Sequence, residues 1–365
     1  MNSREVIDKL IRGKKADRVG LHDSPWGDTI QKWSNEGYLI DAKVNGKITD
    51  ITKHFGFDMS GVGGWFDKMP LKGVSELVEE TDEWEIRRNG AGALFKNWKY
   101  KSGTPEHVDF RMTNREIWEK DYRSHLLTVD KERINIQGTA KMLKKRKEQG
   151  LWTFYGDVFI WETMRGSLGD VCMMESLLLD PDWIHDYNRV YTDFFKAHYR
   201  VLFEEVGKPD GIWVYEDLGY NNGLFCSPAT LKELFFPYYK EYVEFFHSYD
   251  IPVVLHSCGG IESALPLIVE AGFDALNPMQ VKAGCDVVKF ASQYGDRLAF
   301  IGGLDALILE SGDRDLIEKE VIRIIEAMKS LGARYIFGSD HSISTNVAYE
   351  DFMYAIEVYK KHMMY

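Results

Sequence analysis

The motif His256-Ser257-Cys258 puts an imidazole and a thiol two residues apart, directly after the apolar run Ile251–Leu255. This run predicts a strand, and a strand end with the turn that follows can direct residues i and i+2 at one point. Imidazole nitrogen and thiolate sulfur are ligands that Zn²⁺ prefers. The alternative is a core histidine beside an inert thiol. The spacing alone does not distinguish the two, so the surrounding sequence has to.

Polar residues follow most of the other predicted strands as well. These strands are Val19–Leu21, Leu151–Tyr155, Gly211–Tyr215, Asp274–Leu276, Leu298–Ile301 and Arg334–Phe337, and the groups that follow include His22, Asp23, Asp157, Glu216, Asp217, Asn277, Asp305, Asp340 and His341. Buried polar groups that converge cost free energy unless they are used or paired. The pattern therefore indicates a functional site at the strand ends and favours zinc at His256 and Cys258.

The elements that carry these residues alternate regularly. From residue 151 onward, predicted strands and helices follow one another, which is typical of a parallel sheet. A doubly wound sheet usually has a glycine-rich turn after its first strand, and none is found. Short strands near both ends of the chain predict a (β/α)8 TIM barrel, whose active site lies at the C-terminal ends of its strands.

The N-terminal part is less regular. Residues 3–12 predict an amphipathic helix, and a period of two between residues 80 and 112 predicts a β-hairpin or small meander. We interpret Gly61-Val62-Gly63-Gly64 as a turn, because no Lys-Ser/Thr follows it as in a phosphate site. We therefore predict one domain, residues 1–365, with a helical and β-hairpin elaboration inserted at about 23–150.

Composition narrows the function classes. The 365 residues are 44% hydrophobic and 28% charged, which excludes a disordered chain. The net charge of -12 disfavours nucleic acid and anionic membranes as partners. No apolar run has the length of a membrane helix, the N-terminus does not resemble a signal peptide, and four cysteines make no disulfide framework. We predict a cytoplasmic protein.

Several motifs resemble the uroporphyrinogen decarboxylase superfamily across nearly the whole chain, most firmly over residues 150–362. They are Trp161-Glu162 with Arg165-Gly166, Glu216-Asp217-Leu218-Gly219, Ser227-Pro228, Phe236-Pro237-Tyr238-Tyr239, Leu255-His256-Ser257-Cys258-Gly259, Asn277-Pro278 and Gly338-Ser339-Asp340-His341. The resemblance implies a (β/α)8 barrel, in agreement with the alternation of elements. It also implies one of two chemistries, decarboxylation of a porphyrinogen or cobalamin-dependent methyl transfer.

Two departures from the family patterns decide between these chemistries. True decarboxylases have an early arginine for substrate carboxylates, whereas residues 19–26 of this chain contain none. The methyltransferases bind zinc through His-x-Cys and a later cysteine. His256 and Cys258 match the first two positions, and Asp340-His341 stands where the later cysteine would be. The resemblance thus implies His341 as third ligand, with Asp340 as the alternative, and Glu216 as a further ligand.

The predicted function is a zinc-dependent methyltransferase that moves a methyl group between a small methylated molecule and the cobalamin of a partner corrinoid protein. Zinc with one thiolate and harder ligands would activate an ether oxygen, and the many aromatic residues suggest a methoxylated aromatic substrate. The alternatives are a metal-free decarboxylase of the uroporphyrinogen type and a non-catalytic barrel that binds a small ligand or a corrinoid protein.

The remaining candidates have predicted roles with simpler alternatives. Glu216, Asp305 and Asp340 are candidate catalytic residues, and Asp305 is alternatively a metal ligand or a helix cap. Candidate cofactor-binding residues are Asn277, Trp161 and Arg165. Asn277 is alternatively a supporting hydrogen-bond partner, and Arg165 alternatively forms a structural pair with Glu162. We expect Asp217 to support the site rather than act in it, and Cys172, Cys226 and Cys285 to be packing residues.

Overall fold

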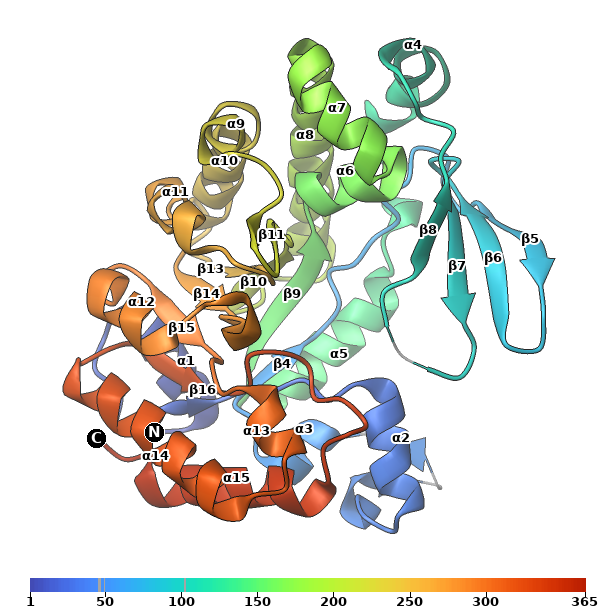
Figure 1. Cartoon of the computed structure of the whole chain (residues 1–365). Helices are drawn as coiled ribbons and strands as arrows, with labels where there is room; N and C mark the ends of the chain where they lie inside the picture. Colours follow the sequence, from blue (N-terminus) through green and yellow to red (C-terminus); the bar gives the residue numbers. More distant parts are fainter. Residues whose placement is uncertain (45–46, 49, 102) are drawn as a thin grey trace.

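Eight parallel strands form a barrel in the computed structural model, which describes residues 1–44, 47–48, 50–101 and 103–365 (Figure 1). Their order is β1-β16-β15-β14-β13-β10-β9-β4. The Leu21 carbonyl accepts a hydrogen bond from the Asp58 amide, at 2.8 Å, next to the two outermost strands, β1 and β4. The predicted (β/α)8 class is confirmed. The strands are β1 (Gly20–Leu21), β4 (Met59–Gly61), β9 (Trp152–Val158), β10 (Gly211–Tyr215), β13 (Val253–His256), β14 (Ala275–Asn277), β15 (Ala299–Ile301) and β16 (Tyr335–Phe337).

Helices follow the strands and cover the outside of the barrel (Figure 1). They are α2 (Gly27–Asn35), α3 (Ile51–Phe55), α4 (Arg115–Ile117), α5 (Ile136–Glu148), α6 (Ile160–Leu168), α7 (Asp170–Leu179), α8 (Pro181–Glu205), α9 (Pro228–Leu234), α10 (Phe236–His247), α11 (Leu265–Ala271), α12 (Val287–Tyr294), α13 (Ala306–Glu310), α14 (Arg314–Ser330) and α15 (Tyr349–His362). Short turns of helix connect some of them: η1 (Ile40–Ala42), η2 (Trp118–Tyr122), η3 (Arg123–Leu126), η4 (Lys131–Arg133), η5 (Glu262–Ala264) and η6 (Val281–Ala283).

The first helix, α1 (Ser3–Ile11), closes the N-terminal end of the barrel. Its buried face, made of Val6, Ile7, Leu10 and Ile11, packs with inward side chains of the strands in a core separate from the one under the outer helices. Gly20 permits this contact, because a Cβ there would lie 2.6 Å from the Ile7 Cδ1 atom. One end of the barrel is therefore filled, and a site has room at the other.

A four-stranded antiparallel sheet stands beside the barrel, where a hairpin at 80–112 was predicted (Figure 1). It contains β5 (Ser75–Glu80), β6 (Trp84–Asn89), β7 (Leu94–Trp98) and β8 (Glu106–Asp109). The smaller pairs β2 (Lys43–Val44) with β3 (Lys47–Ile48) and β11 (Gly219–Tyr220) with β12 (Gly223–Leu224) lie in other loops.

The boundary of the elaboration is a correction to the sequence analysis. Residues 23–150 do not form one insertion, since β4 lies within them and is a barrel strand paired with β9. Only the segment between β4 and β9 carries the extra sheet. Strand β4 has only three residues, and the last of them is glycine. Such a short segment cannot show the alternation of apolar and polar residues that predicts a strand, so the sequence did not reveal β4.

None of the helices in the described part of the chain has the length and hydropathy of a membrane-spanning segment.

Candidate metal centre

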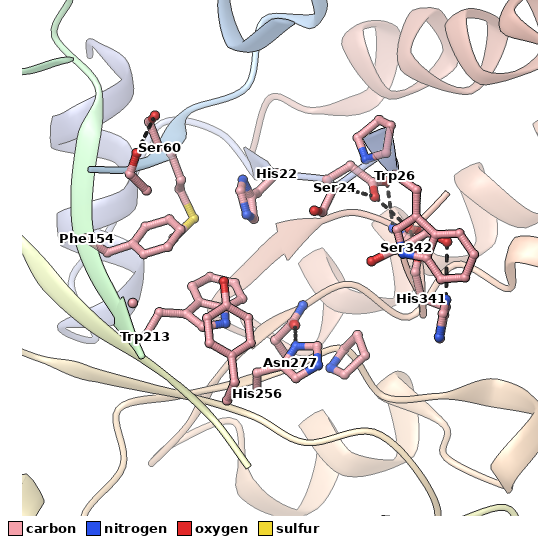
Figure 2. A pocket seen from close by; sticks show the side chains of 18 of the residues that line it. His22, Ser24, Trp26, Ser60, Phe154, Trp213, His256, Asn277, His341 and Ser342 are labelled. Carbon is pink, nitrogen blue, oxygen red and sulfur yellow. Dashed lines mark hydrogen bonds between the residues drawn. The ribbon is translucent and has the colours of Figure 1, made fainter. Parts of the chain in front are cut away.

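A cavity of about 870 Å³ opens at the C-terminal ends of the barrel strands (Figure 2). Residues within or directly after β1, β4, β9, β10, β13, β14 and β16 contribute to its wall, together with part of the turn between β7 and β8. Six aromatic side chains line it: Trp26, Phe57, Trp65, Phe154, Trp213 and Tyr215. This is the edge of the barrel at which the sequence predicted a functional site.

Three potential metal ligands meet in the wall of this cavity. His256 ends β13, Cys258 follows it by two residues, and Asp217 follows β10, the strand that pairs with β13. The His256 Nε2 atom lies 3.5 Å from the Cys258 Sγ atom and 3.7 Å from an Asp217 carboxylate oxygen. All three ligand atoms lie within 4.8 Å of one another.

These separations fit a zinc ion. Tetrahedral zinc with Zn–S of about 2.3 Å and Zn–N and Zn–O of about 2.0–2.2 Å requires about 3.6 Å between sulfur and nitrogen and about 3.4 Å between nitrogen and oxygen. The observed 3.5 and 3.7 Å differ from these by a few tenths of an ångström. Three protein ligands beside a cavity also leave a fourth position for substrate, as in catalytic zinc sites.

Asn277 holds the His256 ring in the orientation that a metal needs. Its side-chain amide nitrogen donates to the Ile301 carbonyl at 2.9 Å, so its oxygen faces His256 Nδ1, at 2.5 Å. A carbonyl oxygen only accepts, and therefore Nδ1 carries the proton and Nε2 presents its lone pair. Asn277 and His256 are neighbours across the β13–β14 pair. Asn277 thus supports the site, which was the simpler of its two predicted roles.

Charge around the three groups favours a cation. Burial lowers the pKa of His256, which keeps the imidazole neutral and able to coordinate. Burial and the carboxylates of Asp217 and Asp340 raise the pKa of the Cys258 thiol. Two carboxylates beside a desolvated thiol repel a thiolate, and a divalent cation reverses this balance.

Glu216, a predicted ligand and catalytic residue, is not part of this group. Its buried carboxylate accepts hydrogen bonds from the amides of Phe159, Trp161 and Glu162 at 2.7, 2.8 and 3.2 Å, and from the Tyr239 hydroxyl at 2.5 Å. Successive residues at a strand end face opposite sides of the sheet. Tyr215 and Asp217 therefore line the cavity, whereas Glu216 points outward and caps helix α6.

The predicted third ligand, His341 or Asp340, does not belong to this group of three either. His341 lines the cavity, packed edge-on against Trp26 with ring centroids 5.7 Å apart, and is not a member of the Asp217, His256 and Cys258 cluster. Asp340 is buried, and its two oxygens accept from the amides of Val281 and Ala306 at 2.8 Å each. Asp340 thus ties together the loops after β14, β15 and β16.

The remaining candidates have structural positions outside the cavity wall. Asp305 caps α13 by accepting from the Leu307 amide at 2.9 Å, which is its predicted alternative role. Trp161 is fully buried against Phe235. Arg165 pairs with Glu162 and Asp170, each at 2.7 Å. Nothing in these contacts assigns Trp161 or Arg165 to a cofactor.

Asp217 is the site residue that the sequence analysis undervalued. The signal was present: Trp213, Tyr215 and Asp217 alternate along one strand and share its inward face. The Cys258 backbone amide also donates to an Asp217 carboxylate oxygen at 2.9 Å, which holds the Asp217 side chain against the backbone of Cys258. The residues that line the far side of the cavity, such as Met59 and Phe154, carried no recognisable motif.

Comparison with one solved structure agrees with this architecture. A methyltransferase from Methanosarcina mazei superposes with a TM-score of 0.71 over 99% of both chains, at 13% sequence identity. A B12-independent methionine synthase from Shewanella sp. W3-18-1, solved in complex with selenomethionine, gives a TM-score of 0.46 at 12% identity over 85% of this chain and 83% of that chain. No curated protein matches in sequence. The model of the uroporphyrinogen decarboxylase (URO-D) family matches residues 166–362, more than half of the chain, and the chain therefore belongs to that family.

Proposed function

We propose that this member of the uroporphyrinogen decarboxylase family is a zinc-dependent methyltransferase, which moves a methyl group between a small methylated molecule and the cobalamin of a partner corrinoid protein. The observation that carries the proposal is the group of Asp217, His256 and Cys258, whose ligand atoms lie within 4.8 Å of one another beside an open cavity. The group lies at the C-terminal ends of the barrel strands, which is the end at which barrels of this kind have their active sites.

Asp217, His256 and Cys258 would hold the metal, and Asn277 would keep the imidazole in its coordinating tautomer. Zinc, when bound, supplies a Lewis acid that makes an oxygen or nitrogen a better leaving group from a methyl carbon. The chain's own residues do the remaining work. The aromatic wall of the cavity binds and orients an apolar substrate. Because the N-terminal end of the barrel is filled, substrate enters from the C-terminal ends of the strands.

The lining of the cavity supports a substrate without negative charge. Among the described residues that form it, no lysine or arginine is present, and two carboxylates, Asp23 and Asp217, are. Six aromatic side chains supply most of the large apolar contacts. An uncharged methoxylated aromatic fits these properties, because it needs apolar contact and no cationic partner.

The same lining weakens the alternative of a porphyrinogen decarboxylase. Uroporphyrinogen carries eight carboxylates, and buried carboxylates need cationic or multiple hydrogen-bond partners. The absence of lysine and arginine from the described part of the cavity wall leaves such a substrate without them. Of the two functions, methyl transfer is better supported than porphyrinogen decarboxylation.

Metal content and methyl transfer test the proposal together. Purified protein should contain about one zinc per chain and should transfer methyl groups from a panel of methyl aryl ethers to added cob(I)alamin, measured by its change in absorbance. His256→Ala should lose both properties, because it removes one of three ligands. The matched control is His125→Ala, which changes an exposed histidine of η3.

Less than about 0.2 zinc per chain, with no binding of added zinc, would contradict the metal centre. Zinc-loaded protein that instead removes carboxylate from uroporphyrinogen would favour the decarboxylase. Retention of zinc by His256→Ala together with a large loss of thermal stability would identify His256 as a core histidine.

A further inference from the structure

Tyr215 presents its side chain to the cavity directly beside the three potential metal ligands. It is the last residue of β10 and shares the inward face of that strand end with Asp217. Its ring centroid lies 5.2 Å from that of His256. The side chain is half-buried, and the cavity is the space that it lines.

The Tyr215 hydroxyl has no hydrogen-bond partner within the part of the chain that the structure describes. It is also absent from the fully buried polar atoms that lack a partner, so the hydroxyl oxygen is accessible. Tyr155 on the neighbouring strand differs, because it points away from the barrel and donates to the Gly207 carbonyl at 2.8 Å. A phenol hydroxyl normally finds a partner when its ring is packed. The cavity is where a ligand would provide one for Tyr215.

The surroundings hold the Tyr215 ring in place. Trp65 stacks on it with ring centroids 5.6 Å apart and planes at 26°, and Trp213 lies behind it at 6.2 Å. On β9, Gly156 leaves room for the ring edge, since a Cβ there would lie 3.2 Å from the Tyr215 Cε2 atom. A hydroxyl on a ring fixed in this way is already oriented before substrate binds.

We infer that the Tyr215 hydroxyl donates a hydrogen bond to the oxygen that bears the transferred methyl group, which makes Tyr215 a catalytic residue and aryl methyl ethers the substrate class. The inference rests on the proposed function. The bond between methyl carbon and oxygen breaks, and its electron pair stays on the oxygen. The methyl carbon forms a new bond with an external nucleophile of the cob(I)alamin class, and the nucleophile contributes both electrons of this new bond. Negative charge grows on the oxygen, and Tyr215 stabilises it.

Other polar groups of the cavity fit this role less well. His22 projects into the cavity on the side away from His256 (Figure 2), and burial lowers its pKa to about 4. Asp23 accepts hydrogen bonds from Ser24 and Ser339 and offers an acceptor where a donor is needed. Tyr215 combines a donor with a position next to the metal ligands.

Tyr215→Phe tests the inference, because it removes the hydroxyl and keeps the ring. Zinc content should not change. Methyl transfer from anisole, whose leaving group is poor, should fall about 100-fold, whereas transfer from 4-nitroanisole, whose leaving group is good, should fall only a few-fold. Gly156→Ala, which crowds the ring, should shift the rates in the same direction. Tyr220→Phe, an exposed tyrosine of β11, is the matched control and should behave as wild type.

Binding of phenol to the zinc-loaded protein provides a readout that does not depend on turnover. Tyr215→Phe should weaken phenol binding about tenfold and leave binding of toluene, which has no oxygen, unchanged. Equal rate losses for all ethers, with unchanged phenol binding, would overturn the inference. Wild-type protein that binds phenol through Tyr215 but transfers no methyl group from any ether would overturn the methyltransferase function and support only the contact between Tyr215 and oxygen.

Discussion

At the scale of single residues, the side of the strand that a carboxylate occupies decides whether it can join His256 and Cys258 in the candidate metal centre. Glu216 and Asp217 are adjacent and both acidic, yet only Asp217 approaches His256, at 3.7 Å. Glu216 accepts four hydrogen bonds on the opposite side of β10. Because successive side chains point to opposite sides of a strand, Asp217 joins the candidate metal centre and Glu216 caps a helix.

Zinc affinity should separate the ligands from their neighbours. We expect Asp217→Ala to weaken zinc binding by more than about 100-fold and Asn277→Ala by about 10–100-fold, because Asn277 only orients His256. His341→Ala should bind zinc like wild type. Competition with a chromophoric chelator measures all three. A large loss for His341→Ala and none for Asp217→Ala would restore the ligand set predicted from the family pattern.

The protonation states of the same site predict how pH affects zinc. Because the pKa of the Cys258 thiol is raised, the metal-free site holds a proton on sulfur at neutral pH, and the lowered pKa of His256 leaves none on its Nε2 atom. Zinc binding should therefore release one proton, and affinity should rise about tenfold per pH unit between pH 7 and 9. Calorimetry in two buffers of different ionisation enthalpy counts that proton.

Cys258→Ala is the control for this measurement and should release none. If wild type releases no proton, the Cys258 thiol is not the group that loses one. If Cys258→Ala still releases a proton, that proton comes from another group.

At the scale of elements, Glu216 explains how helix α6 begins. The N-cap residue of this helix, Phe159, provides no side-chain hydrogen bond, and the first amides of the helix donate to Glu216 on β10 instead. A carboxylate is favoured at the positive end of a helix. The contact joins β10 to the helix that follows β9, on the outer side of the barrel wall.

Stability should therefore depend on Glu216 while zinc binding does not. We expect Glu216→Ala to lower the free energy of unfolding by about 2–4 kcal/mol, because it leaves buried amides without an acceptor. Glu216→Gln keeps one acceptor and should cost less. Urea unfolding measures both, with Glu233→Ala on the exposed side of α9 as the control, expected within about 0.5 kcal/mol of wild type. Unchanged stability combined with loss of zinc would make Glu216 a ligand after all.

At the scale of the whole molecule, the barrel is closed at one end and open at the other. Helix α1 buries Val6, Ile7, Leu10 and Ile11 against the inward side chains of the strands, including Phe154 and Trp213. Phe154 and Trp213 also line the cavity. The side chains in the interior of the barrel thus line the bottom of the cavity on one side and pack against helix α1 on the other.

This arrangement predicts that damage at the closed end destabilises the protein without removing its metal. Ile7→Ala should lower the free energy of unfolding by about 2–5 kcal/mol, because Ile7 is fully buried and the contacts around it are close. Zinc affinity at 20 °C should stay at the wild-type value. Lys9→Ala, a partly exposed residue of the same helix, is the control. Ile7→Ala protein with wild-type stability would show that α1 is not part of the core.

The sequence by itself determined the barrel and two of the three residues of the candidate metal centre. Alternation of strands and helices is a local pattern, and polar residues directly after apolar runs identify the strand ends without any knowledge of their neighbours. His256 and Cys258 could be paired because only one residue separates them. The simpler of the predicted roles also match the observed contacts of three further sites. These are the hydrogen bond of Asn277, the helix cap of Asp305 and the pair of Glu162 with Arg165.

Only the tertiary structure decided which carboxylate joins His256 and Cys258, the position of β4 and the composition of the cavity wall. Asp217 meets His256 because β10 pairs with β13 in a register that sets Tyr215 beside His256, and a shift of one residue would turn Glu216 inward instead. β4 is recognisable as a strand only through its partner β9. These features arise from contacts between segments far apart in the chain, and a pattern read along one segment contains no information on the register between two.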